Sequence, residues 1–319
     1  MIVRWGLDEL PELLAELGVE RPLLVASPRW SPPLEVVGVW SEVPSDRIGH
    51  AAAQAKGADG LLALGGGSAI DLTKAISAET GLPMVSVPTT YSGAEWTPSF
   101  GIRSPEKLMR GGGSGARLAG IVYEPELTLS LPRAETVGTS LNALAHTAEA
   151  LYVKGRNADG DREALAGARL IAEWLPRVAA DGRDIEARRA LLEGAMHAGA
   201  ALAAAGLGLG HAMAQALGGR YGLPHGALNA ITLPAALRFN EPVARAEIAR
   251  FGAAIGTDDP ARRVEELAHL GAFERLRDLG VPEDELEEVA AATVVRGGAQ
   301  ANPRQACKAE ITELLRSIW

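Results

Sequence analysis

The 319-residue sequence combines 47% hydrophobic residues with a formal net charge of -9 and a single cysteine, Cys307. This composition indicates a globular protein of one large domain or two ordinary domains. An acidic chain without clusters of Lys and Arg is not expected to bind nucleic acid or an anionic membrane, although its backbone amides can still hold small anions. One cysteine excludes an internal disulfide framework and a cysteine-based zinc or iron–sulfur site.

The first residues predict an early strand, and no segment predicts a membrane span. The stretch MIVRWGLDELPELL interrupts its apolar residues with charges, and no run elsewhere approaches the ~20 apolar residues needed to cross a bilayer. Residues 2–5 (IVRW) are predicted to form a strand. We therefore expect a soluble protein of the cytoplasm, whose reducing environment suits a chain with one cysteine.

Residues 22–123 alternate short apolar runs with amphipathic segments. The runs are PLLVA, VVGVW, GLLAL, MVSVP and AGIVY. Continuous β-rich runs separated by helical segments are typical of a parallel sheet that is buried on both faces. This part of the chain is predicted to be an α/β domain.

A glycine-rich turn joins one of these runs to a helical segment. In GLLALGGGSAIDLTKAIS, Gly65, Gly66 and Gly67 allow a tight turn and a close approach of backbone amides to a ligand. Ser68 is placed to cap the following helix, whose N-terminus would attract a pyrophosphate. Asp71 lies in the first turn, where a carboxylate is also favourable for structural reasons alone. The motif is not GxGxxG, so a turn without a ligand remains the alternative.

Four hydroxyl-bearing residues follow the run MVSVP: Thr89, Thr90, Tyr91 and Ser92. Ligands bind at the carboxyl ends of strands in open α/β sheets, although Thr and Ser also satisfy backbone groups of their own loops. Two such turns after two strands of one domain favour a nucleotide as their common ligand. A further glycine cluster, GGGSG at residues 111–115, is predicted to lie in a surface loop.

The pattern changes after Pro132. Ala and Leu dominate, β-branched runs disappear, and residues 162–180 and 185–207 keep helical periodicity. The simplest interpretation is an α/β domain of residues 1–131 followed by an all-helical domain of residues 132–319. The glycines of GLGLG, residues 206–210, are predicted to allow close packing of helices.

Two polar side chains, Asn142 and His146, lie four residues apart in the apolar stretch LNALAHTAEAL. At this spacing they share one face of a helix, as two ligands of one ion or substrate would. His211 falls in a helical segment and His225 follows Pro224 at a predicted helix start, so three histidines could converge in a cleft between the two domains. Each could instead be a buried histidine with a hydrogen-bond partner. The other histidines are predicted to have no role in the site: His50, His197 and His269.

Several of these stretches together resemble the iron-containing alcohol dehydrogenase superfamily. GGGSAIDLTKAIS is similar to its GGGSxxDxxK segment, and PTTYSGAEWTPSFGI resembles the corresponding turn of its maleylacetate reductase branch. The resemblance continues through IVYEPELTLSLP, SLNALAHTAEALY, HAMAQALGGRYGLPHGALNAITLP and NPRQACKAEITELL. It implies a Rossmann-like, dinucleotide-binding α/β domain with a parallel sheet, followed by an all-helical catalytic domain, in a dehydroquinate synthase-like fold.

The resemblance implies NAD(H) or NADP(H) as the cofactor. The residues that it assigns to the phosphates and the nicotinamide side are Gly65, Gly66, Gly67, Ser68, Asp71, Thr89, Thr90 and Ser92. Ser27 and Arg29, after an early strand, would lie near the adenosine ribose. No acidic residue stands there to bind the ribose hydroxyls, and Arg29 could pair with a 2′-phosphate, so NADPH should be accepted.

In the iron-dependent members an Asp and three His hold the metal, and the matching positions here are Asn142, His146, His211 and His225. An amide oxygen can coordinate iron or zinc, but it brings no charge to offset that of the cation. Asn142 therefore predicts weak metal binding or none, as in the maleylacetate reductase branch. Gln215 stands where relatives commonly carry a histidine that passes a proton, and Gln cannot titrate, so the proton route is left open.

We expect an NAD(P)H-dependent oxidoreductase that transfers a hydride to a small carbonyl or enone substrate, which an additional carboxylate would suit. His146, His211 and His225 would stabilise the charge that develops on the substrate oxygen. One alternative is a metal-dependent alcohol dehydrogenase of the same superfamily, in which iron or zinc polarises the substrate. Another is a non-redox, lyase-type or inactive nucleotide-binding relative. The resemblance also implies a homodimer joined through the N-terminal strand of residues 2–5.

Overall fold

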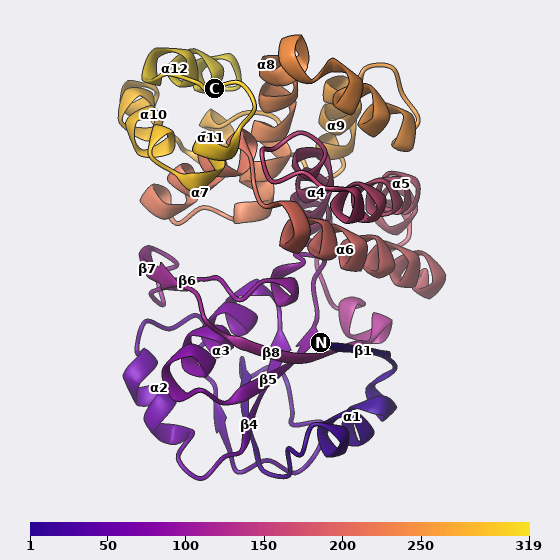
Figure 1. Cartoon of the computed structure of the whole chain (residues 1–319), viewed down its shortest axis with the longest axis vertical. Helices are drawn as coiled ribbons and strands as arrows, with labels where there is room; N and C mark the ends of the chain where they lie inside the picture. The colour runs from indigo at the N-terminus through magenta and orange to yellow at the C-terminus, as the bar shows by residue number, and fades with distance from the viewer. The chain divides into compact units, whose positions relative to one another are not determined.

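The computed structural model describes all 319 residues, and they divide into two compact units (Figure 1). The N-terminal unit comprises Met1–Thr90 and Ala94–Ser130, and the helical unit comprises Tyr91–Gly93 and Leu131–Trp319. The division after Ser130 lies one residue before the predicted boundary between residues 131 and 132. The segment Tyr91–Gly93 belongs to the helical unit, where the Tyr91 N–H donates to Thr139 Oγ1 over 3.4 Å.

The N-terminal unit is built on a six-stranded parallel sheet. In spatial order its strands are β1 (Ile2–Trp5), β8 (Arg117–Tyr123), β5 (Pro83–Pro88), β4 (Gly60–Gly65), β2 (Pro22–Ala26) and β3 (Gly38–Trp40). The central strands β2, β4 and β5 are buried at almost every position, which is why their sequences are continuous apolar runs. The predicted strands and the predicted α/β class are confirmed.

Three helices pack on the faces of this sheet: α1 (Leu10–Glu16), α2 (Ile48–Gln54) and α3 (Gly67–Thr80). The apolar side chains of α1 form a core with one face, and those of α2 and α3 form a core with the other. Successive side chains of a strand point to opposite faces, so Leu23 and Leu24 of β2 belong to different cores, as do Leu61 and Leu62 of β4. The sheet is therefore buried on both faces, as its composition predicted.

The glycine cluster GGGSG does not lie in a loop, and that prediction is wrong. Its three leading glycines belong to β7 (Met109–Gly113), which pairs antiparallel with β6 (Phe100–Arg103). A Cβ on Gly112 would lie 2.8 Å from the Phe100 carbonyl oxygen. Glycine here permits a close strand pairing, a use that sequence alone does not distinguish from a flexible loop.

The helical unit contains nine α-helices and no strand. They are α4 (Arg133–Ala150), α5 (Ala158–Ala180), α6 (Ile185–Ala205), α7 (Leu209–Tyr221), α8 (His225–Ala254), α9 (Pro260–His269), α10 (Leu286–Val294), α11 (Gly297–Ala301) and α12 (Lys308–Ser317). α4 contacts α5, α6, α7 and α8, and nearly all of its residues are buried. α8 is kinked at Ala244, two residues after Pro242. The polar residues of α4 from Ser140 onward therefore lie inside the unit.

The GLGLG stretch spans the turn between α6 and α7 and the first two residues of α7. Gly206 ends α6 with a φ of +90°, and Gly208 is the N-cap of α7. No single helix of the chain is long and apolar enough to cross a membrane. α6 and α7 meet the length and composition requirement only as a pair, and that pair is bent by 101°.

Candidate active site

The turn between β4 and α3 presents backbone N–H groups at a helix N-terminus. Gly66 is the N-cap of α3, and no side chain caps this 14-residue helix. Ser68 lies inside the first turn, two residues after the N-cap, so the predicted capping role is wrong. A Cβ on Gly66 would lie 2.8 Å from Cγ2 of Thr90, and Gly65 has a φ of +154°. This glycine-dependent turn suits an anionic group such as a phosphate.

The residues that follow β5 lie beside this turn. β4 and β5 are parallel neighbours with Gly65 opposite Pro88, and the Thr89 N–H donates to the Gly65 carbonyl oxygen over 3.0 Å. Oγ1 of Thr89 is buried and has no hydrogen-bond partner in the protein, so it is free to bond a ligand. The structure thus brings together six of the predicted cofactor residues: Gly65, Gly66, Gly67, Ser68, Thr89 and Thr90.

Asp71 is held by contacts within the N-terminal unit. Its Oδ1 accepts from Lys74 Nζ over 3.1 Å and its Oδ2 accepts from the Gly101 N–H over 3.2 Å. Lys74 is fully buried and also donates to the Ser99 carbonyl oxygen over 2.9 Å. Asp71 therefore joins α3 to the β6–β7 hairpin, and its predicted contact with a cofactor stays a prediction.

The remaining predicted cofactor residues lie at other positions. Ser27 directly follows β2 and is half-buried, and Arg29 is exposed with its guanidinium 4.5 Å from the centre of the Trp30 ring. Ser92 belongs to the helical unit, where its carbonyl oxygen accepts from Asn142 Nδ2 over 2.9 Å. A contact of any of the three with a nucleotide stays a prediction.

Three helices of the helical unit each contribute one imidazole to a cluster. The ring centroids of His146 on α4 and His211 on α7 are 4.6 Å apart, and the two planes are nearly parallel at 18°. The ring of His225 is 5.9 Å from that of His211 and tilted by 49°. His225 is the first residue of α8, after the N-cap Pro224, so its helix-start position is confirmed. The structure brings the three predicted histidines together.

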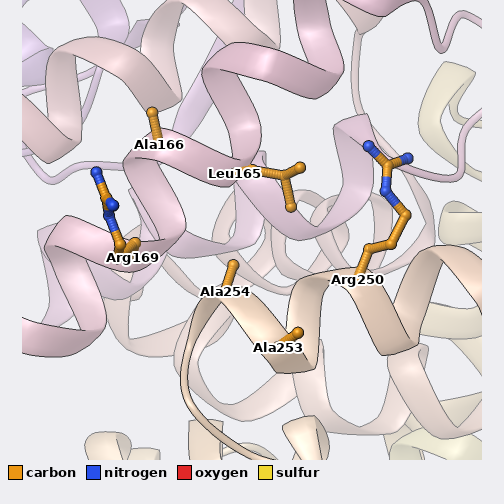
Figure 2. A pocket seen from close by; sticks show the side chains of 6 residues that line it. All are labelled: Leu165, Ala166, Arg169, Arg250, Ala253 and Ala254. Carbon is orange, nitrogen blue, oxygen red and sulfur yellow. The ribbon is translucent and has the colours of Figure 1, made fainter.

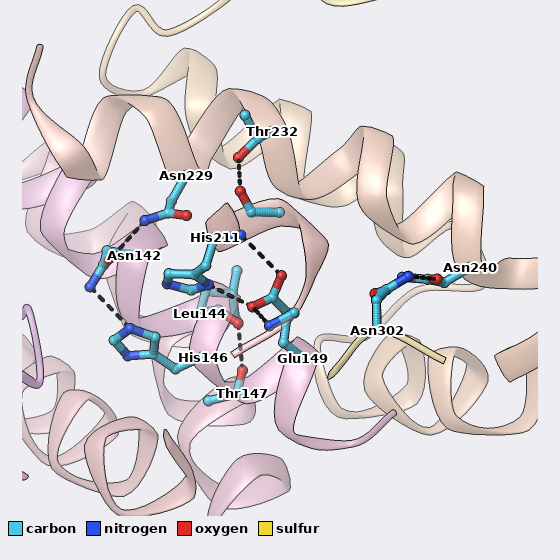
Figure 3. Close-up of polar contacts among 12 residues, drawn as sticks. Asn142, Leu144, His146, Thr147, Glu149, His211, Asn229, Thr232, Asn240 and Asn302 are labelled. Carbon is cyan, nitrogen blue, oxygen red and sulfur yellow. Dashed lines mark hydrogen bonds and ion pairs between the residues drawn. The ribbon is translucent and has the colours of Figure 1, made fainter. Parts of the chain in front are cut away.

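The amide of Asn142 is oriented by two neighbours, of which Figure 3 shows Asn229. Its Oδ1 accepts from Asn229 Nδ2 over 2.7 Å, and its Nδ2 donates to the Ser92 carbonyl oxygen over 2.9 Å. The opposite orientation would set two oxygens against each other at Ser92. The amide therefore turns its NH2 group toward His146, whose Nε2 is 3.5 Å from Asn142 Nδ2. Asn229, fully buried in the motif PHGALNAITLP, is a site residue that sequence reasoning missed.

His146 is a neutral, buried imidazole. Burial lowers its pKa well below the usual value, and the neighbouring imidazoles of His211 and His225 lower that pKa further. Because Nε2 faces an N–H donor, the ring proton is assigned to Nδ1, which is buried without a hydrogen-bond partner. A Cβ on Gly93 would lie 3.5 Å from Nδ1, so glycine at this position keeps a side chain away from that nitrogen.

A carboxylate that sequence reasoning missed holds His211. Glu149, on α4 three residues after His146, is fully buried, and its Oε2 accepts from His211 Nδ1 over 2.7 Å (Figure 3). Nδ1–H is thus committed to Glu149, and Nε2 of His211 is buried without a partner in the protein. A charged residue in the Ala-rich stretch AHTAEAL was the available signal, since a buried Glu requires a partner.

The donor set does not fit a metal ion. The rings of His146 and His211 lie nearly parallel with their centroids 4.6 Å apart, and Asn142 presents its NH2 group in place of its oxygen. No group of three or more His, Cys, Asp or Glu side chains in the chain is arranged to hold a metal. Coordination by three imidazoles and an oxygen would require these side chains to rearrange. The expectation of weak metal binding or none stays a prediction.

The other residues named from the sequence lie outside this cluster. Gln215 is half-buried on α7, one turn after His211. His197 binds Glu163 Oε2 through Nδ1 over 2.7 Å and is partly exposed, and His50 and His269 are exposed. A shallow pocket lies between α5 and α8 near the end of α8 opposite His225, so it is not part of the cluster (Figure 2). It is lined by Leu165, Ala166, Arg169, Arg250, Ala253 and Ala254.

Descriptions of two known protein families match this chain. Residues 3–118 match the family described as Iron-containing alcohol dehydrogenase, and residues 136–319 match the Fe-containing alcohol dehydrogenase family, C-terminal. The chain belongs to the iron-containing alcohol dehydrogenase family. The two matches together cover most of each unit, including the glycine-rich turn at residues 65–68 and all three clustered histidines.

Within the iron-containing alcohol dehydrogenase family the chain is similar to maleylacetate reductases. It is 37% identical to the one from Sphingobium indicum, covering 88% of this chain and 81% of the relative, and 35% identical to the one from Burkholderia cepacia, covering 99% and 95%. Two solved structures superpose with TM-scores of 0.90. They are a maleylacetate reductase from Agrobacterium tumefaciens (31% identity, 100% and 95% coverage) and an iron-containing alcohol dehydrogenase from Corynebacterium glutamicum (30%, 100% and 94%). The predicted NAD(P)H-dependent oxidoreductase of maleylacetate reductase type is confirmed.

Proposed function

We propose that this oxidoreductase reduces a small unsaturated keto acid of the maleylacetate type and does so without a bound metal. The observation that carries the proposal is the histidine cluster, in which Asn142 offers an N–H group where a metal site needs an oxygen. Similarity to several maleylacetate reductases over nearly the whole chain supports the substrate class. An acidic substrate also suits a site that contributes imidazoles and an amide.

The N-terminal unit would hold NAD(P)H through the turn at residues 65–68. The N–H groups at the uncapped start of α3 fit a pyrophosphate, and the unpartnered Thr89 Oγ1 offers a further hydrogen bond. Bound there, NAD(P)H supplies the hydride. Arg29, which is exposed beyond β2, is our candidate for the 2′-phosphate of NADPH.

The helical unit would stabilise the negative charge that forms on the substrate oxygen and supply the proton that neutralises the product. Reduction of a conjugated double bond places an electron pair on the substrate's carbonyl oxygen, and the resulting enolate is neutralised by a proton at the neighbouring carbon. His146 Nδ1–H is a buried donor without a partner, suited to bond that oxygen. His211 Nε2 is the nitrogen left to take up a proton from water and pass it to that carbon, because Nδ1–H is committed to Glu149.

A metal-dependent alcohol dehydrogenase is the second candidate. The convergence of three histidines from three helices favours it, as does structural similarity to the iron-containing alcohol dehydrogenase from Corynebacterium glutamicum. In this alternative a metal would have to draw Asn142 Oδ1 away from Asn229 and separate the stacked imidazole rings.

One experiment separates the two functions. The purified protein is analysed for iron and zinc, treated with a chelator, and assayed for NADH and NADPH oxidation with maleylacetate and with simple aldehydes. We expect chelator-resistant turnover of maleylacetate by protein that contains less than one metal per chain. Turnover of aldehydes that disappears with the chelator and returns with iron or zinc would establish the second candidate instead.

We also propose that the protein forms a homodimer through β1. This strand lies at the edge of the sheet and pairs with β8 on one side only, and an edge strand is where a second copy of the chain could extend the sheet. Light scattering on the intact protein tests this, because a monomeric mass at micromolar concentration would contradict it.

A further inference from the structure

We propose that Glu149 is a positioning residue of the active site, which fixes the proton of His211 on Nδ1 and holds the ring so that Nε2 faces the reaction. The inference deepens the proposed function, because it assumes that the histidine cluster is where the substrate is reduced. No contact between Glu149 and the substrate is required. The carboxylate acts through His211.

The contacts of Glu149 account for both of its oxygens. Oε2 accepts from the Gly208 N–H over 2.6 Å and from His211 Nδ1 over 2.7 Å, and Oε1 accepts from the His211 backbone N–H over 3.2 Å. Glu149 and His211 are 0% and 1% exposed, so water does not compete for these bonds. The same carboxylate therefore binds the backbone and the ring of His211, which leaves the ring little freedom to turn.

The start of α7 leaves room for this carboxylate. A Cβ on Gly208 would lie 3.0 Å from Glu149 Cδ, and a Cβ on Gly210 would lie 3.0 Å from Oε1. Glycine at these two positions makes the room that the carboxylate occupies. The N-terminus of α7 also stabilises a negative charge, so a buried carboxylate is favourable here.

Helix capping alone does not explain the arrangement. A cap needs only an oxygen for the free N–H groups, and a Ser, Thr, Asp or Asn at the N-cap position supplies it locally. Here the N-cap is Gly208, and the oxygen comes from a residue 59 positions earlier on α4. Unlike a local cap, Glu149 also accepts a hydrogen bond from His211 Nδ1. The Nε2 atom of the same ring has no partner in the protein.

A second Glu–His pair in the same unit serves as a matched control. His197 Nδ1 and Glu163 Oε2 are also 2.7 Å apart, but both side chains are about a quarter exposed and belong to α6 and α5, which carry none of the clustered histidines. Glu163→Gln removes the same kind of contact without touching the proposed site. Its kinetic constants should equal those of the unmodified protein.

The first test needs no substrate and no variant of Glu149. Nitrogen-15 NMR of histidine-labelled protein reports which ring nitrogen carries the proton, and a His211→Gln sample identifies the His211 signals. We expect a proton on Nδ1 of His211. A neutral ring with its proton on Nε2 overturns the inference, whatever the activity of the protein is.

The second test is a double-mutant cycle in kcat with NADPH and maleylacetate. Glu149→Gln should lower kcat by ~100-fold or more, within the range that positioned acid–base groups contribute, and leave the KM for NADPH unchanged. In a His211→Gln background the same substitution should lower kcat no further. Independent, multiplicative losses would assign Glu149 a structural role and contradict the inference, whereas an inactive unmodified protein would instead contradict the proposed function.

Discussion

The candidate site of the N-terminal unit is formed by backbone groups, whereas that of the helical unit is formed by side chains. The turn at residues 65–68 offers backbone N–H groups, and its geometry depends on the absence of side chains. The cluster in the helical unit depends on side chains whose orientations are fixed by other side chains, as Asn229 fixes Asn142 and Glu149 fixes His211. A backbone site tolerates changes in polar side chains but not added bulk, whereas a side-chain site is lost when one of its polar side chains is replaced.

The largest expected effect comes from the side-chain site. His146→Ala removes the Nδ1–H donor that we assign to the substrate oxygen, and the loss of one such donor typically costs ~10²- to 10³-fold in kcat. The KM for NADPH should stay the same, since the cofactor turn belongs to the other unit. Steady-state kinetics measures both constants. A variant with normal kcat would remove His146 from the mechanism.

Added bulk should affect the backbone site through binding. Gly66→Val would push a side chain into Thr90, which lies 2.8 Å from the Cβ position, and so displace the turn. We expect the KM for NADPH to rise ~10- to 100-fold, corresponding to about 1.4–2.8 kcal/mol, with kcat at saturation much less affected. Gly111→Ala is the matched control, because the nearest atom to its Cβ position is 3.9 Å away. A normal KM in Gly66→Val would place the cofactor elsewhere.

A negative charge at position 142 should increase the affinity of the cluster for a metal ion. In Asn142→Asp the carboxylate can still accept from Asn229, but it brings a negative charge to three imidazoles and removes the NH2 group that faces His146. We expect the affinity for zinc to rise by more than ~10-fold, because a group that only hydrogen-bonds to a metal ligand already changes metal affinity by at least that factor. Isothermal titration calorimetry of the metal-free protein measures this. Equal affinities in both proteins would show that residue 142 does not control metal binding.

The smallest effect is expected at the cofactor's periphery. Arg29 is exposed, so its pairing with a 2′-phosphate is screened by water and is worth about 0.2–1 kcal/mol. Arg29→Ala should therefore raise the KM for NADPH ~2- to 5-fold and leave the KM for NADH unchanged. Competition assays with the two cofactors measure the ratio. An equal change for both would remove Arg29 from 2′-phosphate recognition.

Elements of the fold and the site could be predicted from the sequence where a few consecutive residues determine them. Strands β2, β4 and β5 and helices α5 and α6 could be predicted because their apolar patterns are properties of a few consecutive residues. His225 at the start of α8 was predictable because Pro224 precedes it. Ser68 lies two residues after the N-cap, and a shift of that size at a helix end decides whether a hydroxyl caps the helix.

The missed residues depend on partners that are distant in the sequence. Asn142 is oriented by Asn229, 87 positions later, and Glu149 receives its bonds from residues 59 and 62 positions later. No local pattern reveals that a glutamate on an Ala-rich helix is fully buried or which N–H groups it accepts. The residue types were readable from the sequence, whereas the hydrogen-bond network required the fold.

Gly208 and Gly210 have a consequence for attempts to make the protein more thermostable. Replacing glycine by alanine near a helix is a common stabilising change, because it restricts the unfolded chain. At Gly210, inside α7, the new methyl group would instead press on Glu149 Oε1, and at Gly208 it would press on the same carboxyl group. A screen for heat resistance that ignores activity could therefore select changes that turn His211 away from its working orientation.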